Sequence, residues 1–181
     1  LETIFEDRLI QIQSFPLKHR IPTWGYRISE KPKPFHLNAA AIQEAGLSLE
    51  DLPKLKAGKN LEKNGKILRF EKFTFPPSPS LSYVYCSDTK PWTGYEAAIE
   101  KADLMYHEAT FTDQHADRAK QTYHSTAKQA ATMAKKMDVQ RLVIGHFSSR
   151  YENSQQHLEE AKSIFNQTCC AEDGMWIDLE K

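Results

Sequence analysis

The chain has 181 residues, with 24 basic and 24 acidic side chains and a formal net charge of zero. This balance excludes a uniformly basic nucleic-acid-binding protein, so any RNA binding has to come from local patches. No apolar run approaches the roughly 18 residues of a membrane-spanning helix, and acidic residues interrupt the region where a signal peptide would be apolar. Three cysteines without framework spacing favour a reducing compartment, so we expect a cytoplasmic protein.

The first 30 residues predict short strands around one loop. Within 3–15, apolar and polar residues alternate on either side of a turn, which is typical of two paired strands. A loop then carries His19, and another short strand follows it. Taken alone, a histidine between Lys18 and Arg20 is more often a solvated loop residue than a ligand. Because the chain opens on Leu1 rather than methionine, we expect a truncated or processed start.

Residues 29–66 differ in character, because they are rich in proline and lysine. One helix is expected there, with Asn38 as its N-cap and Gly46 just past its end. A second short helix is expected to start at Ser48. Large apolar residues are too sparse to predict a core, so we interpret this stretch as a protruding arm. On composition alone, a merely solvated arm and an RNA-binding arm are equally consistent with it.

The rest of the chain alternates between strands and helices, as in a largely parallel sheet. Residues 67–75 first predict one more alternating strand, followed by a proline-rich loop. Further strands are expected at 82–86, 104–106, 141–145 and 175–177, with helices at 94–101, 113–120, 127–136 and 154–165.

Polar side chains gather where three of these strands end. They are Asp88, His107, Glu108 and His146, and His124 stands just ahead of a predicted helix. In open α/β sheets, ligands bind at the carboxyl ends of the strands. A carboxylate can bridge two metal ions, and neutral imidazole is a common zinc ligand. One such residue alone predicts a turn, but together they predict a metal-dependent site.

Five stretches of the sequence also carry a family resemblance. They are 16–19 (Pro-Leu-Lys-His) with 25–27 after it, 85–89 (Tyr-Cys-Ser-Asp-Thr), 107–111 (His-Glu-Ala-Thr-Phe), 124–127 (His-Ser-Thr-Ala) and 145–151 (Gly-His-Phe-Ser-Ser-Arg-Tyr). In this order they resemble the ribonuclease Z family, the tRNA 3′-processing endonucleases of the metallo-β-lactamase superfamily. The match covers nearly the whole chain except 29–66.

This resemblance implies a fold and an activity. The fold would be of the α/β (α+β) class, with residues 1–181 as the C-terminal part of one metallo-β-lactamase αββα sandwich domain and 29–66 as a flexible arm. The activity would be that of a zinc-dependent endoribonuclease, which hydrolyses a phosphodiester to remove the 3′ trailer of precursor tRNA. The family further implies a homodimer in which the arm of one subunit serves the active site of the other.

By the same resemblance, each predicted site residue takes a role. His19 would bind one zinc ion, His146 would bind the other, and Asp88 would bridge the two. His124 would protonate the leaving 3′ oxygen or hold the scissile phosphate, with Glu108 orienting it. The substrate phosphate would be held by Ser148, Arg150 and Ser125, and the tRNA by Lys54, Lys56 and Lys59 in the arm.

The sequence departs from the family pattern in two places. The family's His-x-His-x-Asp-His motif is absent, so we expect a missing N-terminal part to supply most metal ligands, and this chain alone to bind fewer zinc ions or none. The arm also lacks the family's usual Gly-Pro signature. Two alternatives stay open, a phosphodiesterase acting on small substrates and a non-catalytic RNA-binding or assembly fragment.

Overall fold

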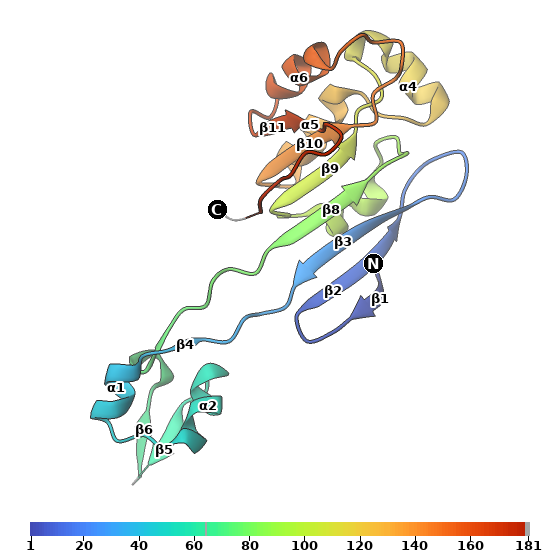
Figure 1. Cartoon of the computed structure of the whole chain (residues 1–181). Helices are drawn as coiled ribbons and strands as arrows, with labels where there is room; N and C mark the ends of the chain where they lie inside the picture. Colours follow the sequence, from blue (N-terminus) through green and yellow to red (C-terminus); the bar gives the residue numbers. More distant parts are fainter. Residues whose placement is uncertain (64, 180–181) are drawn as a thin grey trace. The chain divides into compact units, whose positions relative to one another are not determined.

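The computed structural model describes residues 1–63 and 65–179 and divides them into two compact units (Figure 1). One unit comprises Leu1–Glu30 and the described residues from Leu81 onward, and the other comprises Lys31–Ser80. Most of the predicted arm, 29–66, falls within the second unit, which continues beyond it to Ser80. Among the described residues, no helix is long and apolar enough to cross a membrane.

The described residues of the first unit form a seven-stranded mixed sheet in the order β1-β2-β3-β8-β9-β10-β11. The strands from β1 to β8 pair antiparallel, and those from β8 to β11 pair parallel. The antiparallel part agrees with the paired strands expected near the start of the chain, and the parallel part agrees with the alternation expected after it. The strands are β1 (Glu2–Glu6), β2 (Ile10–Pro16), β3 (Trp24–Glu30), β8 (Ser82–Cys86), β9 (Leu104–Glu108), β10 (Arg141–Gly145) and β11 (Thr168–Cys170).

The helices of the first unit follow strands β8, β9 and β10. Helix α5 has the expected bounds because its N-cap, Thr126, forms a capping box with Gln129. Its buried face consists mainly of alanines, which let the helix lie close to the sheet. The helical segments are η3 (Thr93–Tyr95), α3 (Glu96–Ile99), η4 (Asp113–His115), α4 (Ala116–Thr122), α5 (Ala127–Lys136) and α6 (Gln155–Lys162).

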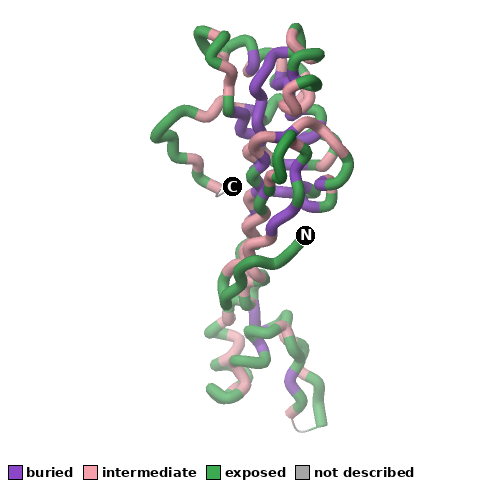
Figure 2. The backbone as a smooth tube through the Cα atoms, turned by 90° about the vertical axis from the view of Figure 1, so that its right-hand side faces the viewer, coloured by how far each residue is buried: buried purple, intermediate pink, exposed green. Residues whose placement is uncertain are grey.

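The main core lies between the sheet and these helices. Alternate residues of the central strands point to this face, as the pleat of a strand requires. In Figure 2 the central strands are therefore largely buried, whereas every residue of β1 is exposed. The strand side chains Val84, Cys86, Met105, Leu142 and Ile144 pack in one cluster with the alanines of α5. This packing fixes the start of α5 beside the carboxyl ends of β8, β9 and β10.

The prediction of a last strand at 175–177 is wrong. The edge of β10 is paired with β11, where Val143 lies opposite Cys169, and β11 is the last strand of this sheet among the described residues. Residues 175–179 have no regular secondary structure, and Trp176 is 97% exposed. The guanidinium of Arg141 donates to the backbone carbonyl of Asp178 and ties this tail to β10.

The second unit has a core of its own, and the expectation that its apolar residues are too sparse for one is wrong. Leu55, Leu61 and Phe73 are buried and are surrounded by partly buried apolar side chains. The side chain of Asn38 accepts from the amide of Ala41, as predicted for an N-cap. The elements are β4 (His36–Leu37), α1 (Ala39–Glu44), η1 (Leu49–Asp51), α2 (Leu52–Lys56), β5 (Leu61–Lys63), β6 (Lys66–Leu68), η2 (Phe70–Lys72) and β7 (Thr74–Phe75).

Candidate active site

Asp88 and His146 lie just past the ends of β8 and β10, and both adopt a left-handed backbone, with φ of 57° and 60°. This conformation costs a non-glycine residue about 1–2 kcal/mol, and such strain gathers at functional sites. Gly145 permits the close approach before His146, because a Cβ there would lie 2.5 Å from the hydroxyl of Tyr106. The two turns bring Asp88 Oδ1 within 3.3 Å of His146 Nε2. The structure thus brings together two predicted metal ligands.

Glu108 ends β9 and is completely buried. Its carboxylate accepts hydrogen bonds from the Thr89 amide at 2.6 Å, the Ser125 amide at 3.1 Å and the Thr110 hydroxyl at 2.5 Å. His124 Nδ1 donates to the same carboxylate at 2.8 Å. A buried charge with this many donors is held in one orientation. The predicted pairing of Glu108 with His124 is therefore present in the geometry.

The pKa values of this pair move apart. The hydrogen bond to Glu108 raises the pKa of His124 above its ordinary 6.5, although burial opposes the shift. Burial alone would raise the pKa of Glu108, but the hydrogen bonds from His124 and Thr110 outweigh it and lower that pKa below 4.5. An ionised carboxylate beside a protonated imidazole is the state that these shifts favour.

Pairing between the segment after β9 and the segment before α5 explains why His124 lies next to Glu108. Phe111 forms a parallel bridge with Thr126, in which the Phe111 amide donates to the Ser125 carbonyl. The amide of Ala127, at the start of α5, donates in turn to the Phe111 carbonyl at 3.0 Å. The segment that carries His124 is thereby attached to the chain that leaves β9.

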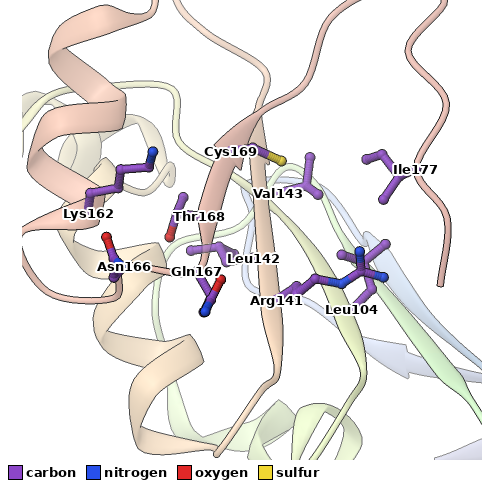
Figure 3. Close-up of a pocket in the computed structure, with 10 residues that line it drawn as sticks. All are labelled: Leu104, Arg141, Leu142, Val143, Lys162, Asn166, Gln167, Thr168, Cys169 and Ile177. Carbon is purple, nitrogen blue, oxygen red and sulfur yellow. The ribbon is translucent and has the colours of Figure 1, made fainter. Parts of the chain in front are cut away.

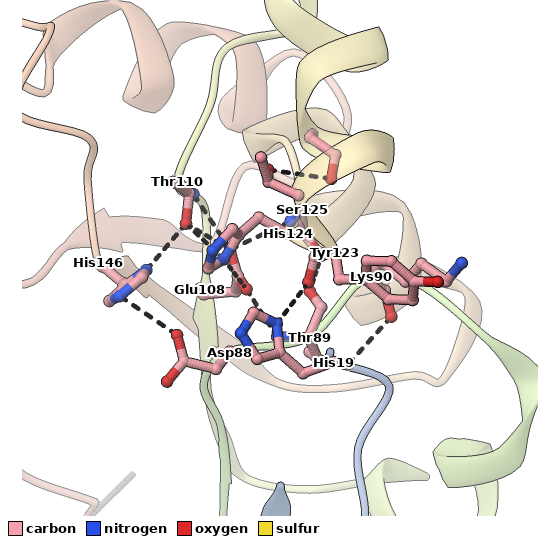
Figure 4. A network of polar contacts seen from close by, with 12 residues as sticks. His19, Asp88, Thr89, Lys90, Glu108, Thr110, Tyr123, His124, Ser125 and His146 are labelled. Carbon is pink, nitrogen blue, oxygen red and sulfur yellow. Dashed lines mark hydrogen bonds and ion pairs between the residues drawn. The ribbon is translucent and has the colours of Figure 1, made fainter. Parts of the chain in front are cut away.

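Thr110 connects the parts of the site, and sequence analysis gave it no role (Figure 4). Its hydroxyl donates to Glu108, so its oxygen is left to accept from His146 Nδ1 at 2.8 Å. This contact places the proton of neutral His146 on Nδ1 and leaves the Nε2 lone pair facing Asp88. The signal in the sequence was its position, two residues past a strand-terminal carboxylate.

His19 lies on the other side of His124, with 5.0 Å between the ring centroids. Its Nδ1 contacts the backbone carbonyl of Tyr123 at 3.1 Å, and a carbonyl can only accept, so Nδ1 carries the proton. Tyr123 is itself left-handed, with φ of 62° at the end of α4. The Nε2 of His19 is thereby left as an acceptor, as a metal ligand requires.

The donor set fits a divalent metal ion. Ligand atoms of Asp88, Glu108, His124 and His146 lie within 4.8 Å of one another, while His19 stands outside this group. Glu108 and His124 Nδ1 already satisfy each other, which makes Glu108 an orienting group rather than a free ligand. The open donors are the Asp88 carboxylate and the imidazole nitrogens that face it. Carboxylate with imidazole is a donor set that zinc accepts.

Ser148 and Arg150 lie together beside this cluster. The Ser148 amide donates to the Thr110 carbonyl at 3.1 Å, and Arg150 Nε donates to the Ser148 hydroxyl at 3.2 Å. The guanidinium lies over the ring of Phe111, 4.8 Å from its centroid. Arg150 is exposed and keeps further N–H donors for an anion.

Two expectations need correction. Ser125 is fully buried, its hydroxyl donates to the Thr89 carbonyl at 2.7 Å, and its amide donates to Glu108, so it is not open to a phosphate. His107 does not join the polar cluster, because its neighbour Glu108 takes the other face of β9. Its Nε2 meets the hydroxyl of Tyr95 at 3.2 Å inside the core.

The three arm lysines, Lys54, Lys56 and Lys59, are exposed and lie around the end of α2 in the second unit. The amide of Lys59 donates to the carbonyl of Lys54 at 2.9 Å, so the backbones of these two residues are close. All three side chains are thus exposed in that unit, and their binding of tRNA stays a prediction.

A separate hollow lies at the opposite end of the parallel strands (Figure 3). It encloses about 370 Å³ and includes Arg141, Leu104 and Cys169, at or near the starts of their strands. No predicted site residue lines it. The cluster at the carboxyl ends remains the candidate active site.

Curated relatives resemble the chain over almost all of its length. Ribonuclease Z of Porphyromonas gingivalis strain W83 is 42% identical over 177 residues, which are 97% of this chain and 58% of the relative. Ribonuclease Z of Cytophaga hutchinsonii is 43% identical over 175 residues, 96% of this chain and 56% of the relative. The chain thus spans a little over half the length of these relatives. No family model matches it.

Solved structures agree on the fold. The short form of human tRNase Z is 25% identical to this chain and superposes with a TM-score of 0.61. The match covers 99% of this chain and 47% of the tRNase Z chain. A metallo-β-lactamase-fold protein of Bacillus subtilis is 15% identical and superposes with a TM-score of 0.62. That match covers 96% of this chain and 51% of the Bacillus protein. The mixed sheet and its helices are therefore part of a metallo-β-lactamase fold.

Proposed function

We propose that this chain is part of a ribonuclease Z, because it is similar to ribonuclease Z proteins over a little more than half of their length, and that the complete protein is a zinc-dependent endoribonuclease. Its substrate is precursor tRNA, which it hydrolyses just 3′ of the discriminator nucleotide to leave a 3′ hydroxyl. The chain described here supplies part of the metal site, the proton donor and the phosphate contacts.

One observation carries this proposal, the convergence of three strand ends on a carboxylate-histidine cluster. Asp88 and His146 follow two parallel strands, Glu108 ends the strand between them, and the segment before α5 adds His124. A single hydroxyl, that of Thr110, contacts Glu108, His124 and His146. Such a network supports both a metal site and a positioned acid, which phosphodiester hydrolysis needs.

The proposed mechanism assigns each side chain one step. Bound metal ions supply Lewis-acid stabilisation of the phosphate charge. Arg150 and Ser148 hold the phosphate oxygens beside the cluster. His124, protonated because of its raised pKa, gives the proton on its other ring nitrogen to the leaving 3′ oxygen, while Nδ1 stays on Glu108. Glu108 stabilises the imidazolium and keeps the ring aimed at the bond that breaks.

Metal content tests the ligand assignment. With His19, Asp88 and His146 as its contribution, the isolated chain is expected to retain less than one zinc ion after dialysis. In the complete protein, Asp88→Asn should lower zinc content, because a carboxylate that would hold the metal loses its charge. Asp117→Asn, at an exposed carboxylate on α4, is the matched control and should leave it unchanged. Stoichiometric zinc in the isolated chain at Asp88 and His146 would contradict the incomplete site.

The arm is proposed to bind the tRNA through its lysines, in a homodimer where the arm of one subunit serves its partner's active site. A core of its own supports an arm that presents a fixed surface. Light scattering of the complete protein tests the dimer, since a monomeric mass at working concentration would exclude it. A cytoplasmic location is also proposed, because all three thiols are free.

Replacing Lys54, Lys56 and Lys59 together with glutamine should raise KM for precursor tRNA. Each lost phosphate contact makes the salt dependence shallower by roughly 0.7–0.9 log units per log unit of salt. Cleavage of a small phosphodiester, which has no tRNA body for the arm to bind, should hardly change. Steady-state kinetics over a salt series measures all three quantities.

A matched triple variant of Lys101, Lys135 and Lys162, all exposed in the first unit, removes the same charge elsewhere. It should leave KM for precursor tRNA nearly unaltered. Equal loss of small-substrate and tRNA activity in the arm variant would make the arm a structural part of the core.

Comparing precursor tRNA with bis(p-nitrophenyl) phosphate separates this function from a phosphodiesterase that acts on small molecules. The complete protein should cut the RNA at one defined site. Hydrolysis of the small diester without cleavage of the RNA would favour the alternative. Binding of RNA with neither reaction would favour a non-catalytic fragment of an assembly.

A further inference from the structure

Three cationic side chains lie beside His19, at the edge of the polar cluster. They are Lys18, Arg20 and Lys90, and we call them the basic rim. Lys18 and Arg20 are exposed and flank His19, while Lys90 is half-buried on the loop after β8. The mechanism above uses none of them. The chain has a net charge of zero, so three cationic side chains around His19, a predicted metal ligand, are a local excess of positive charge.

The backbone joins the two loops that carry this rim. The amide of Lys90 donates to the carbonyl of Lys18 at 3.0 Å, and the amide of Lys18 donates to the hydroxyl of Thr89 at 3.0 Å. Thr89 also donates its amide to Glu108, so the rim is connected directly to the catalytic cluster. Its position relative to the reacting groups is therefore fixed.

Two of the ammonium groups are held over aromatic faces. Lys90 Nζ lies 4.3 Å from the ring centroid of Tyr123, and Lys18 Nζ lies 5.7 Å from that of Trp92. A ring face attracts a cation and limits its motion, which lowers the entropy lost when the cation binds an anion. Neither lysine forms an ion pair with a carboxylate among the described residues, so both charges stay available.

The rim and the pair Ser148–Arg150 flank the cluster on different sides. Figure 4 shows Lys90 and Tyr123 beyond His19, on the side away from His146. Ser148, in contrast, is attached to Thr110, which contacts His146. A phosphodiester at the cluster therefore has one cationic contact beside His146 and a second group of cations past His19. That arrangement suits a polyanionic strand longer than a single phosphate.

We propose that Lys18, Arg20 and Lys90 bind backbone phosphates of the RNA strand next to the scissile bond, and that Tyr123 and Trp92 hold two of these cations in place. This inference rests on the proposed function, because it assigns the strand being cut to the rim. The ligand is the sugar-phosphate backbone, so base sequence has little influence on the contact.

Binding of a short, unstructured, fluorescently labelled RNA to the full chain in EDTA tests the rim without turnover. Anisotropy titrations over a salt series give Kd and its salt slope. Lys90→Gln should weaken binding several-fold and make the slope shallower by about 0.7. Lys90→Arg should keep the slope, and Lys135→Gln, an exposed control on α5, should change neither quantity. An abasic strand of equal length should behave as the RNA does.

Tyr123 provides a second, independent variant. Asparagine tolerates the left-handed backbone at this position but lacks the aromatic face. Tyr123→Asn should therefore weaken binding about two- to five-fold with an unchanged salt slope, since Lys90 keeps its charge but loses its support. Tyr123→Phe should bind like the original chain. Circular dichroism of each variant confirms that the fold is retained.

The proposed role of the rim is overturned if Lys90→Gln changes the salt slope of RNA binding no more than Lys135→Gln does. It is also overturned if Lys90→Gln does not change the salt slope for the abasic strand. A failure of the rim is separable from a failure of the proposed function. Precise cutting of precursor tRNA by the complete protein, with RNA binding unaffected in the rim variants, would reject the rim alone. Slope changes as expected, with no cutting, would reject the endonuclease.

Discussion

His124→Ala in the complete protein is expected to lower kcat for precursor tRNA by roughly 10²–10⁴-fold, while tRNA affinity stays almost intact. As the proposed proton donor, the imidazole would act on the leaving oxygen, whose charge develops only in the transition state. The proposed contacts of the arm and of the phosphate-binding residues would form in the ground state as well, and the substitution does not remove them. Single-turnover and binding measurements separate the two quantities.

The pH dependence of kcat is a second test of His124 as the proton donor. The pKa of His124 lies above 6.5 because of Glu108, so the imidazole stays protonated to a higher pH than a free histidine. Activity that needs this proton should fall as pH rises through the raised pKa. His36→Ala, at an exposed histidine on β4, is the control for kcat. If His124→Ala raised KM and left kcat intact, the residue would hold substrate rather than transfer a proton.

Glu108→Gln is expected to reduce the free energy of unfolding of the first unit by about 3–5 kcal/mol, the usual cost of breaking a buried ion pair. Two backbone amides, of Thr89 and Ser125, donate to this carboxylate, and one half of the amide that replaces it carries only donors. Urea unfolding followed by tryptophan fluorescence isolates the effect, because Trp24, Trp92 and Trp176 all lie in the first unit.

The stability that the Glu108–His124 pair contributes depends on pH in a defined direction. The lowered pKa of Glu108 contributes stability above about pH 4.5 that is lost as pH falls through the folded-state pKa. The raised pKa of His124 contributes stability below about pH 6.5 that is lost as pH rises through its folded-state value. Glu108→Gln should flatten both limbs. Glu152→Gln, at an exposed carboxylate, should alter neither, and an equal loss in both variants would argue against a structural role for Glu108.

Local pattern was enough to predict the elements that build the site. Strands β8 and β10 and helix α5 have the expected bounds, because strands rich in aromatic or branched apolar residues and a capped helix with an alanine face are strong short-range signals. The polar residues after the strands were found in the same way, since parallel strands end at one edge. The last strand was missed because pairing at an edge depends on competition, and β11 occupies the side of β10 that a later strand would need.

Apart from the pairing of Glu108 with His124, which the family resemblance implied, the side-chain partners inside the site could not be predicted from the sequence. Adjacent residues of a strand point to opposite faces, so His107 and Glu108 could not both reach the cluster, and the sequence alone did not say which one would. Ser125 was expected to face substrate, but its hydroxyl is used on Thr89. Thr110 contacts its near neighbour Glu108 and two histidines from more distant parts of the chain, His124 and His146. Such assignments depend on tertiary geometry.

The most direct measurement is the mapping of the RNA ends that the complete protein makes from a precursor tRNA. We expect one cut immediately 3′ of the discriminator, with a 3′ hydroxyl on the tRNA and a 5′ phosphate on the trailer. The 3′ hydroxyl follows if the phosphate lies between the Asp88–His146 pair and His124, the proposed proton donor. Cuts spread along the trailer, or a tRNA that ends in a 3′ phosphate, would contradict the account.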